Sequence, residues 1–127
     1  MTSAVKDASA VIALLKRERG GSKVMAVVAD AALGVFNQAE VVSHFVHLGA
    51  PVKETHSMLA AFAVLAADEE LSWDAGALRA VTSSAGLSLG DRFCLALSKR
   101  LGVPAYIADR AWKDVASDVG VRVAVIR

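Results

Sequence analysis

Near its start the chain reads Val5-Lys6-Asp7-Ala8-Ser9-Ala10-Val11-Ile12-Ala13-Leu14-Leu15, and this stretch decides the fold. A short apolar strand is expected at Ala4–Asp7, and a segment of helical period follows at Ala8–Lys16. An acidic residue therefore stands where a strand ends and a helix begins. Short apolar runs followed by segments of helical period recur along the 127-residue chain, which predicts an α/β fold with a parallel sheet.

Further strands and helices are expected on the C-terminal side of this stretch. The strands are predicted at Leu33–Phe36, Ala63–Ala67, Ala105–Ala108 and Val121–Ile126. The helices are predicted from Ser22 to about Asp30, at Asn37–Leu48, from Pro51 to about Phe62, at Asp68–Ala85 and at Ser88–Leu101. Gly49, Gly86 and Gly102 are typical helix C-terminal residues. No repeat or linker interrupts the chain, so we expect one domain over residues 1–127.

Composition excludes several classes of protein. A hydrophobic fraction of 55% excludes intrinsic disorder, and a single cysteine excludes an internal disulfide or a cysteine metal cluster. Fourteen basic and thirteen acidic residues nearly cancel, so the chain has no overall basic charge for clamping nucleic acid. The longest uncharged stretch, residues 55–67, is too short for a membrane span. Charged residues flank the first apolar run, unlike a signal peptide, so a cytoplasmic protein is expected.

Four acidic residues lie where a predicted strand ends or a predicted helix begins. They are Asp7, Glu40, Asp91 and Asp109. The carboxyl ends of parallel strands meet at one edge of a sheet, so these four side chains are expected to converge. Clustered carboxylates repel one another unless a cation neutralises them, and hard oxygen ligands suit Mg²⁺ or Mn²⁺. The pattern favours a metal-dependent active site.

Each of these acids also has a purely structural explanation. Glu40 and Asp91 each lie three residues after an Asn or Ser, which is the spacing of a capping box. Asp7 and Asp109 fit simple helix N-caps, and the helix dipole favours acids in a first turn. Capping is the more frequent role for any one of them. The occurrence of all four at one edge is what favours a site.

The sequence resembles a known family in four places. These are the opening stretch quoted above, then Asn37-Gln38-Ala39-Glu40-Val41, Leu87-Ser88-Leu89-Gly90-Asp91-Arg92 and Tyr106-Ile107-Ala108-Asp109. In order, spacing and total length they resemble the PIN-domain ribonuclease toxins of the VapC type. The resemblance covers essentially the whole chain. One such motif is common, whereas four in order are fairly specific.

The resemblance implies both a fold and an activity. The fold is a PIN-like three-layer arrangement in which helices flank a parallel five-stranded sheet in order 3-2-1-4-5. The activity is a Mg²⁺-dependent (or Mn²⁺-dependent) endoribonuclease that acts on tRNA or rRNA and pairs with a cognate antitoxin; a homodimer is also expected. Asp7, Glu40, Asp91 and Asp109 match the family's catalytic and metal-binding quartet, and Ser9 matches the hydroxyl residue that often follows the first acid.

Lys6 departs from the family pattern. Where the family has an apolar strand residue, a lysine must reach solvent, pair with an acid or distort the strand. A lysine close to the carboxylates would compete with a metal ion. Lys6 therefore keeps open a catalytically weakened interaction module as one alternative function.

A receiver-like phosphoacceptor domain is the other alternative, since it has a similar length and an acidic Mg²⁺ pocket. That family is expected to have paired acids after its first strand, whereas a single Asp7 stands here. Arg92 and Arg110 directly follow two of the acids and are candidates for contacts with substrate phosphates or water. Ser9 is a further candidate for a contact with substrate or water. His44 and His47 share a helical stripe with Glu40, for which a solvated surface is favoured over a metal site.

Overall fold

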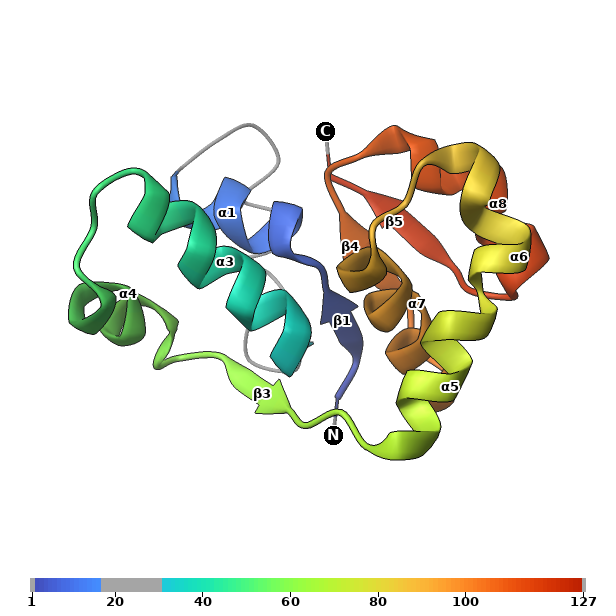
Figure 1. Cartoon of the computed structure of the whole chain (residues 1–127), viewed down its shortest axis with the longest axis horizontal. Coiled ribbons are helices and arrows are strands. Elements are labelled where there is room, and N and C mark those ends of the chain that lie inside the picture. Colours follow the sequence, from blue (N-terminus) through green and yellow to red (C-terminus); the bar gives the residue numbers. More distant parts are fainter. Residues whose placement is uncertain (1, 17–30, 127) are drawn as a thin grey trace.

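The computed structural model describes residues 2–16 and 31–126, and its central feature is a parallel sheet in the order β3-β2-β1-β4-β5 (Figure 1). The strands are β1 (Ala4–Lys6), β2 (Ala31–Gly34), β3 (Ala63–Leu65), β4 (Ala105–Ile107) and β5 (Val123–Val125). The predicted PIN-like α/β class and the strand order 3-2-1-4-5 are confirmed. The helix expected from Ser22 to about Asp30 lies outside the described residues.

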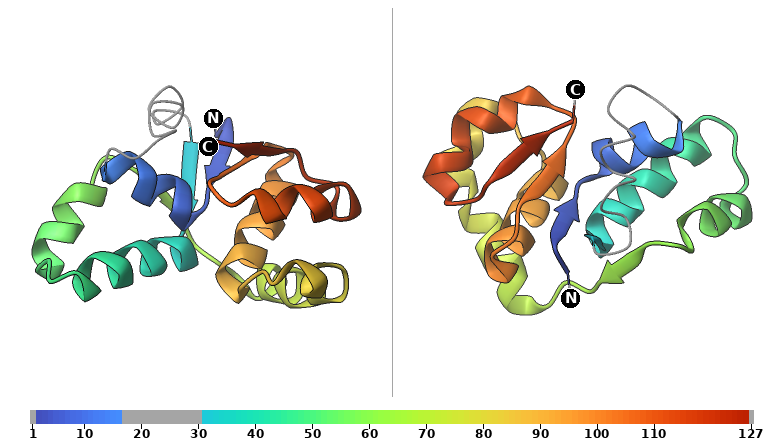
Figure 2. Two further views of the ribbon diagram at one scale, coloured as in Figure 1. Left: turned by 90° about the horizontal axis from the view of Figure 1, so that it is seen from above. Right: turned by 180° about the vertical axis from the view of Figure 1, so that it is seen from behind.

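Helices lie on both sides of the central strand. They are α1 (Ala8–Leu15), α3 (Val35–His47), α4 (Val52–Leu59), α5 (Glu69–Ala77), α6 (Arg79–Thr82), α7 (Leu89–Leu101) and α8 (Lys113–Val119). In the three views α1, α3 and α4 lie to one side of β1, and α5 to α8 lie to the other (Figures 1 and 2). Within the described part of the chain, no helix is long and apolar enough to cross a membrane.

Consecutive residues of β1 face opposite sides of the sheet. Val5 is fully buried and belongs to the hydrophobic cluster that includes Phe93 and Leu97 of α7. Lys6 pairs in register with Leu33 of β2, and Leu33 belongs to a separate cluster with residues of α1, α3 and α4. This alternation is the normal geometry of a strand, and it places Val5 and Lys6 in different environments.

The second strand ends two residues earlier than predicted. The prediction was Leu33–Phe36, whereas β2 ends at Gly34 and Val35 is the first residue of α3. The run from Ala31 to Phe36 is apolar except for one glycine, so hydrophobicity does not mark where the strand stops. Gly34 marks it instead, because it is the N-cap of α3, and a Cβ atom at this position would lie only 3.3 Å from side-chain atoms of Asn37 and Leu97.

The segment predicted as one helix over Asp68–Ala85 is divided. Asp68 is the N-cap of α5, which ends at Ala77, and α6 and a 3₁₀ turn at Ser83–Ala85 follow. The Thr82 hydroxyl donates a hydrogen bond to the Leu78 carbonyl, a local bond that competes with a regular helix. The segment stops at Gly86, where φ is +68°, and α7 stops at Gly102 as predicted.

The helix α8 was not predicted. It lies between β4 and β5 and follows a 3₁₀ turn at Arg110–Trp112. Trp112, Val115 and Val119 are all buried in the cluster around α7, at spacings of three and four residues. The helical stripe is therefore present in the sequence, but it is short and charged residues interrupt it.

Candidate active site

Asp7 is held rigidly at the end of β1. It is the N-cap of α1, and its Oδ1 accepts a hydrogen bond from the Ala10 amide at 2.9 Å. The Ser9 hydroxyl donates to both carboxylate oxygens, at 2.7 and 2.8 Å. Although Asp7 is only 3% exposed, these bonds give its carboxylate defined partners. The predicted N-cap role of Asp7 is thus confirmed, and it does not exclude a second role.

Burial raises the pKa of the Asp7 carboxyl from 3.8 to about 7. The hydrogen bonds from Ser9 and Ala10 lower that pKa, and the nearby charges of Asp91 and Glu40 raise it further. A buried carboxylate beside two other acids is destabilised in its charged form. Asp7 therefore sits where a cation is electrostatically favoured.

Ser9 links the first strand to the fourth. Its hydroxyl oxygen accepts a hydrogen bond from the Ala108 amide at 2.9 Å while the hydroxyl proton goes to Asp7. Ser9 thus holds Asp7 against the end of β4. Its predicted contact with substrate or water stays a prediction.

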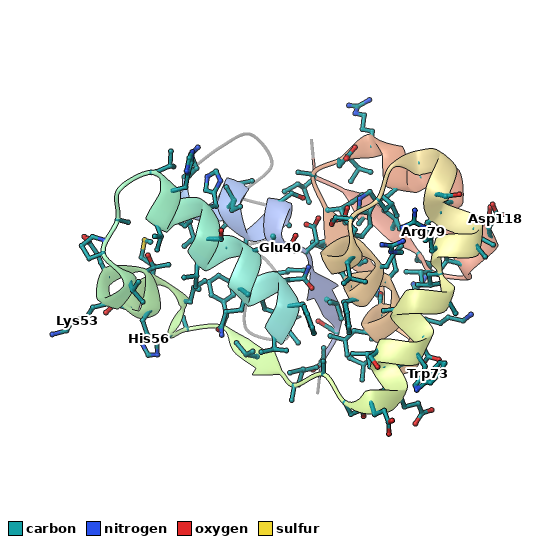
Figure 3. The ribbon with its side chains drawn as sticks, in the orientation of Figure 1. Glu40, Lys53, His56, Trp73, Arg79 and Asp118 are labelled. Atoms are coloured by element: carbon teal, nitrogen blue, oxygen red, sulfur yellow. The ribbon has the colours of Figure 1, made fainter. Side chains whose placement is uncertain are left out.

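Glu40 reaches the same region from α3. It is half-buried, and in Figure 3 it lies on the side of α3 that faces the centre of the molecule. The Asn37 side-chain amide donates to its Oε1 at 3.0 Å. Burial raises the pKa of Glu40, the bond from Asn37 lowers it, and the charge of Asp91 raises it.

The capping box predicted at Asn37 and Glu40 is wrong. The helix α3 begins at Val35 with Gly34 as its N-cap, so Asn37 is already the third helical residue. Glu40 is therefore beyond the first turn, too far from the N-cap to bond its amide. The actual partner of Glu40, the Asn37 amide, was missed because the spacing suggested a cap.

Asp91 does form a capping box. Its Oδ2 accepts from the Ser88 amide at 2.9 Å, and the Asp91 amide donates to the Ser88 hydroxyl at 3.2 Å. Burial raises the pKa of Asp91, the bonds to Ser88 lower it, and the charge of Asp109 raises it. Asp91 thus combines its predicted structural role with a position in the acidic cluster.

The remaining predicted residues are Asp109, Arg92 and Arg110, of which the first two act on Asp91 by their charges. Asp109 follows β4 and is exposed, and its charge acts on Asp91. Arg92 is buried, lowers the pKa of Asp91 by its charge, and has an Nε without a hydrogen-bond partner among the described residues. Arg110 is exposed in the 3₁₀ turn after β4. The predicted contacts of Arg92 and Arg110 with substrate stay predictions.

The carboxylates form a loose group. Within residues 2–16 and 31–126, no three His, Cys, Asp or Glu side chains are placed to hold one metal ion together. Mg²⁺ in nucleases is typically held by one or two carboxylates with water and substrate phosphate completing its shell. A set of hard oxygen donors whose pKa values are raised by burial and by one another therefore fits such an ion.

An open groove of about 590 Å³ adjoins Glu40. It is lined by residues of α3 and of the start of α7, among them Phe36, Glu40, His44, His47, Leu89 and Gly90. His47 is exposed, as the predicted solvated stripe requires, whereas His44 is half-buried. The Phe36 ring stacks on Phe93 with 3.9 Å between ring centroids.

Comparison with known proteins identifies the family. A DNA-bound VapBC complex from Salmonella typhimurium superimposes with a TM-score of 0.75 at 11% identity, covering 100% of both chains. A toxin–antitoxin complex from Klebsiella pneumoniae gives 0.76 at 17% identity and 98% of each chain. A VapBC-family complex from Mycobacterium tuberculosis gives 0.65 at 21% identity, covering 100% of this chain and 99% of that one.

These structural relatives show the fold alone, because their sequence identities are low. No curated protein sequence matches the chain. The sequence itself matches the family model of the PIN domain over residues 4–118. That match includes Asp7, Glu40, Asp91 and Asp109, and it shows that the chain belongs to the PIN domain family.

Proposed function

We propose that this PIN-family chain is a Mg²⁺-dependent endoribonuclease toxin, one domain over residues 1–127, that a cognate antitoxin holds inactive. The observation that carries the proposal is the meeting of Asp7, Glu40 and Asp91, which come from three elements far apart in sequence. The charges of Glu40 and Asp91 raise the pKa of Asp7, and Asp91 raises that of Glu40. The structural relatives named as toxin–antitoxin complexes support the biological setting.

Mg²⁺ or Mn²⁺ would be held by carboxylates drawn from Asp7, Glu40, Asp91 and Asp109, one or two to an ion, with water and the RNA phosphate as its other ligands. When bound, the ion supplies positive charge that activates a water molecule and stabilises the scissile phosphate of the RNA. Ser9 and the Ala10 amide keep the Asp7 carboxylate from rotating. Ser88 does the same for Asp91, so the RNA meets carboxylates of fixed orientation.

Glu40 is the residue that orients the attacking water or takes its proton. Its Oε1 accepts the hydrogen bond from Asn37, which leaves Oε2 for the water. A carboxylate is a better proton acceptor near neutral pH when its pKa is raised, and burial raises that of Glu40. We propose tRNA or rRNA as substrate and a homodimer as the assembled form.

The two alternative functions lose their support. The matching family is the PIN domain, and a receiver domain would need paired acids where Asp7 stands alone. The weakened module was motivated by Lys6 next to Asp7. The Lys6 amine instead donates to the Ala31 carbonyl at 3.3 Å and lies 4.5 Å from the centre of the Phe62 ring. No carboxylate of the described residues contributes to its pKa shift.

The experiment is incubation of the purified protein with total RNA, followed by mapping of new RNA ends. We expect specific new ends with Mg²⁺ or Mn²⁺ and none with EDTA. Asp91→Asn should abolish them, whereas Asp118→Asn, which changes an exposed acid on α8 remote from the cluster, should not (Figure 3). Full cleavage in EDTA, or equal activity of both variants, would refute the proposal.

A further inference from the structure

Asn37 is a buried polar side chain that lies beside Glu40. It is 1% exposed, and it does not cap α3, because Gly34 does. Its side-chain amide nitrogen donates to Glu40 Oε1 at 3.0 Å and to the Gly90 carbonyl at 3.1 Å. Both partners belong to the candidate site. Asn37 therefore connects α3, which carries Glu40, to the first turn of α7, which carries Asp91.

The orientation of the Asn37 amide is fixed by its partners. Turning the amide over would place its oxygen against the carboxylate of Glu40 and the carbonyl of Gly90, which are both acceptors. In the observed orientation the buried Oδ1 has no hydrogen-bond partner among the described residues. An unpaired buried oxygen costs free energy, so the two bonds from the nitrogen are what hold Asn37 in place.

Gly90 faces Glu40 from the other helix. A Cβ atom at position 90 would stand 2.3 Å from Glu40 Oε1 and 2.5 Å from its carboxyl carbon, far closer than atoms approach. Gly90 does not have a positive φ, so its backbone conformation would also allow other residues. A side chain at position 90 would instead displace the Glu40 carboxylate, which is the flexible end of that side chain. Asn37 and Gly90 therefore confine the Glu40 carboxylate from two sides.

We propose that Asn37 and Gly90 are positioning residues, which we call the Glu40 clamp, and that they fix the Glu40 carboxylate for metal binding and RNA hydrolysis. This inference rests on the proposed function. The clamp holds Oε1 and leaves Oε2 for water or a cation. Asn37 is buried and Gly90 has no side chain, so in this proposal both act through Glu40.

The clamp is tested by Mn²⁺ binding, measured by calorimetry in two backgrounds. In the otherwise wild-type protein, Asn37→Leu or Gly90→Ala should weaken Mn²⁺ binding by about fivefold or more. In the Glu40→Gln background the same changes should alter binding by less than about twofold, since the residue they position is already disabled. Because Asn37→Leu and Gly90→Ala change different helices, the test can still be made if one of the two variants does not fold.

Thr55→Val is the matched control for loss of a buried polar group. Thr55 is fully buried in α4, which carries none of the four predicted acids, and its hydroxyl donates to the Pro51 carbonyl at 3.2 Å. The control should lower thermal stability while leaving Mn²⁺ affinity and RNA cleavage unchanged. For the clamp variants we expect kcat to fall by about tenfold with little change in KM.

The outcomes separate the clamp from the proposed function. Equal losses of Mn²⁺ affinity in both backgrounds would overturn the clamp, as would variants that behave like Thr55→Val. A wild-type protein that binds Mn²⁺ but cleaves no RNA would refute the nuclease while the binding comparison still decides the clamp. A wild-type protein that binds no Mn²⁺ would overturn both.

Discussion

Lys6 and Asp7 are neighbours in sequence, both are buried, and burial shifts the pKa of both. The pKa of Lys6 falls from 10.5 to about 8, and that of Asp7 rises from 3.8 to about 7. Yet the two opposite charges do not meet, since the strand turns them to different faces of the sheet. Asp7 accepts hydrogen bonds from Ser9 and Ala10, whereas the Lys6 amine makes one hydrogen bond at 3.3 Å and lies over the Phe62 ring.

The difference shows how burial of a charge is to be interpreted. Around Asp7 the hydrogen bonds from Ser9 and Ala10 offset part of the burial, but the neighbouring acids add to it, so a cation would be electrostatically favoured there. Around Lys6, apolar side chains and a single carbonyl provide partial compensation, and nothing further is gained there. Asp7 therefore has the features of a functional group, and Lys6 those of a tolerated substitution in a strand.

The largest expected difference is in RNA cleavage. Asp7→Asn keeps the N-cap acceptor but removes the charge, so we expect cleavage to fall by roughly a thousandfold. Lys6→Leu should change the rate and the Mg²⁺ affinity by less than about twofold, because the amine lies apart from the carboxylates. Rates on a fluorogenic RNA and Mg²⁺ titrations measure both. A faster Lys6→Leu enzyme with tighter Mg²⁺ binding would show that Lys6 does act on the site.

The pH dependence of stability should identify Asp7 next. With its pKa raised from 3.8 to about 7, the folded protein binds more protons than the unfolded chain between these pH values. The free energy of unfolding without metal should therefore fall as pH rises from about 4 to 7, by up to about 4 kcal/mol. Urea unfolding in EDTA measures this slope. Asp7→Asn should flatten this slope and should be more stable than the wild type at pH 8. An unchanged slope in Asp7→Asn would show that another titrating group causes it.

Lys6→Leu should stabilise the protein by about 2 kcal/mol at pH 7. Moving the pKa from 10.5 to about 8 corresponds to about 3 kcal/mol, from which the lost hydrogen bond and ring contact subtract. Because the folded protein binds fewer protons than the unfolded chain between pH 8 and 10.5, wild-type stability rises through that window. The increase in the free energy of unfolding caused by Lys6→Leu should be largest below pH 8 and should become smaller towards pH 10.5. A destabilised variant would show that Lys6 is needed for the strand.

Asp91→Asn should have the smallest effect on metal-free stability, less than about 1 kcal/mol. The loss of a negative charge at the N-terminus of α7 should destabilise the protein. The buried carboxylate is itself unfavourable, so replacing it with a neutral amide should offset that loss. Thermal unfolding in EDTA compares this variant with Asp7→Asn at the same pH. A large increase in the stability of Asp91→Asn would mean that burial and repulsion dominate at Asp91, as they do at Asp7, and that its capping box contributes little.

Much of the fold was predictable because the chain alternates clearly between apolar runs and helical periods. The strand order came from resemblance, since pairing between distant strands leaves no local signal. The end of β2 and the existence of α8 were not predicted correctly. In both places tertiary packing decides: Leu97 of α7 leaves little room for a side chain at position 34, and Trp112, Val115 and Val119 are buried in the core around α7.

The candidate site was predictable at the level of residue type and position along the chain. That each acid lies where a predicted strand ends or a predicted helix begins is visible in the sequence, and the structure places the charges of Asp7, Glu40 and Asp91 within range of one another. The hydrogen-bond partners of each acid were harder to predict from the sequence. The same three-residue spacing gives a capping box at Asp91 but not at Glu40, because the start of α3 depends on a glycine outside the motif.

The hydrogen bond between the Ser9 hydroxyl and the Ala108 amide joins residues 99 positions apart. During synthesis on the ribosome, β1 leaves the exit tunnel long before β4, although β4 is its neighbour in the sheet. Until then Ser9 lacks the amide that it accepts from, and Asp7 lies at an unpaired strand edge. Contacts of such long sequence separation form late. A chain translated only as far as α7 therefore carries Asp7, Glu40 and Asp91 but lacks the bond that ties Ser9 to the end of β4, so under the proposed function the site is completed only after β4 has been made.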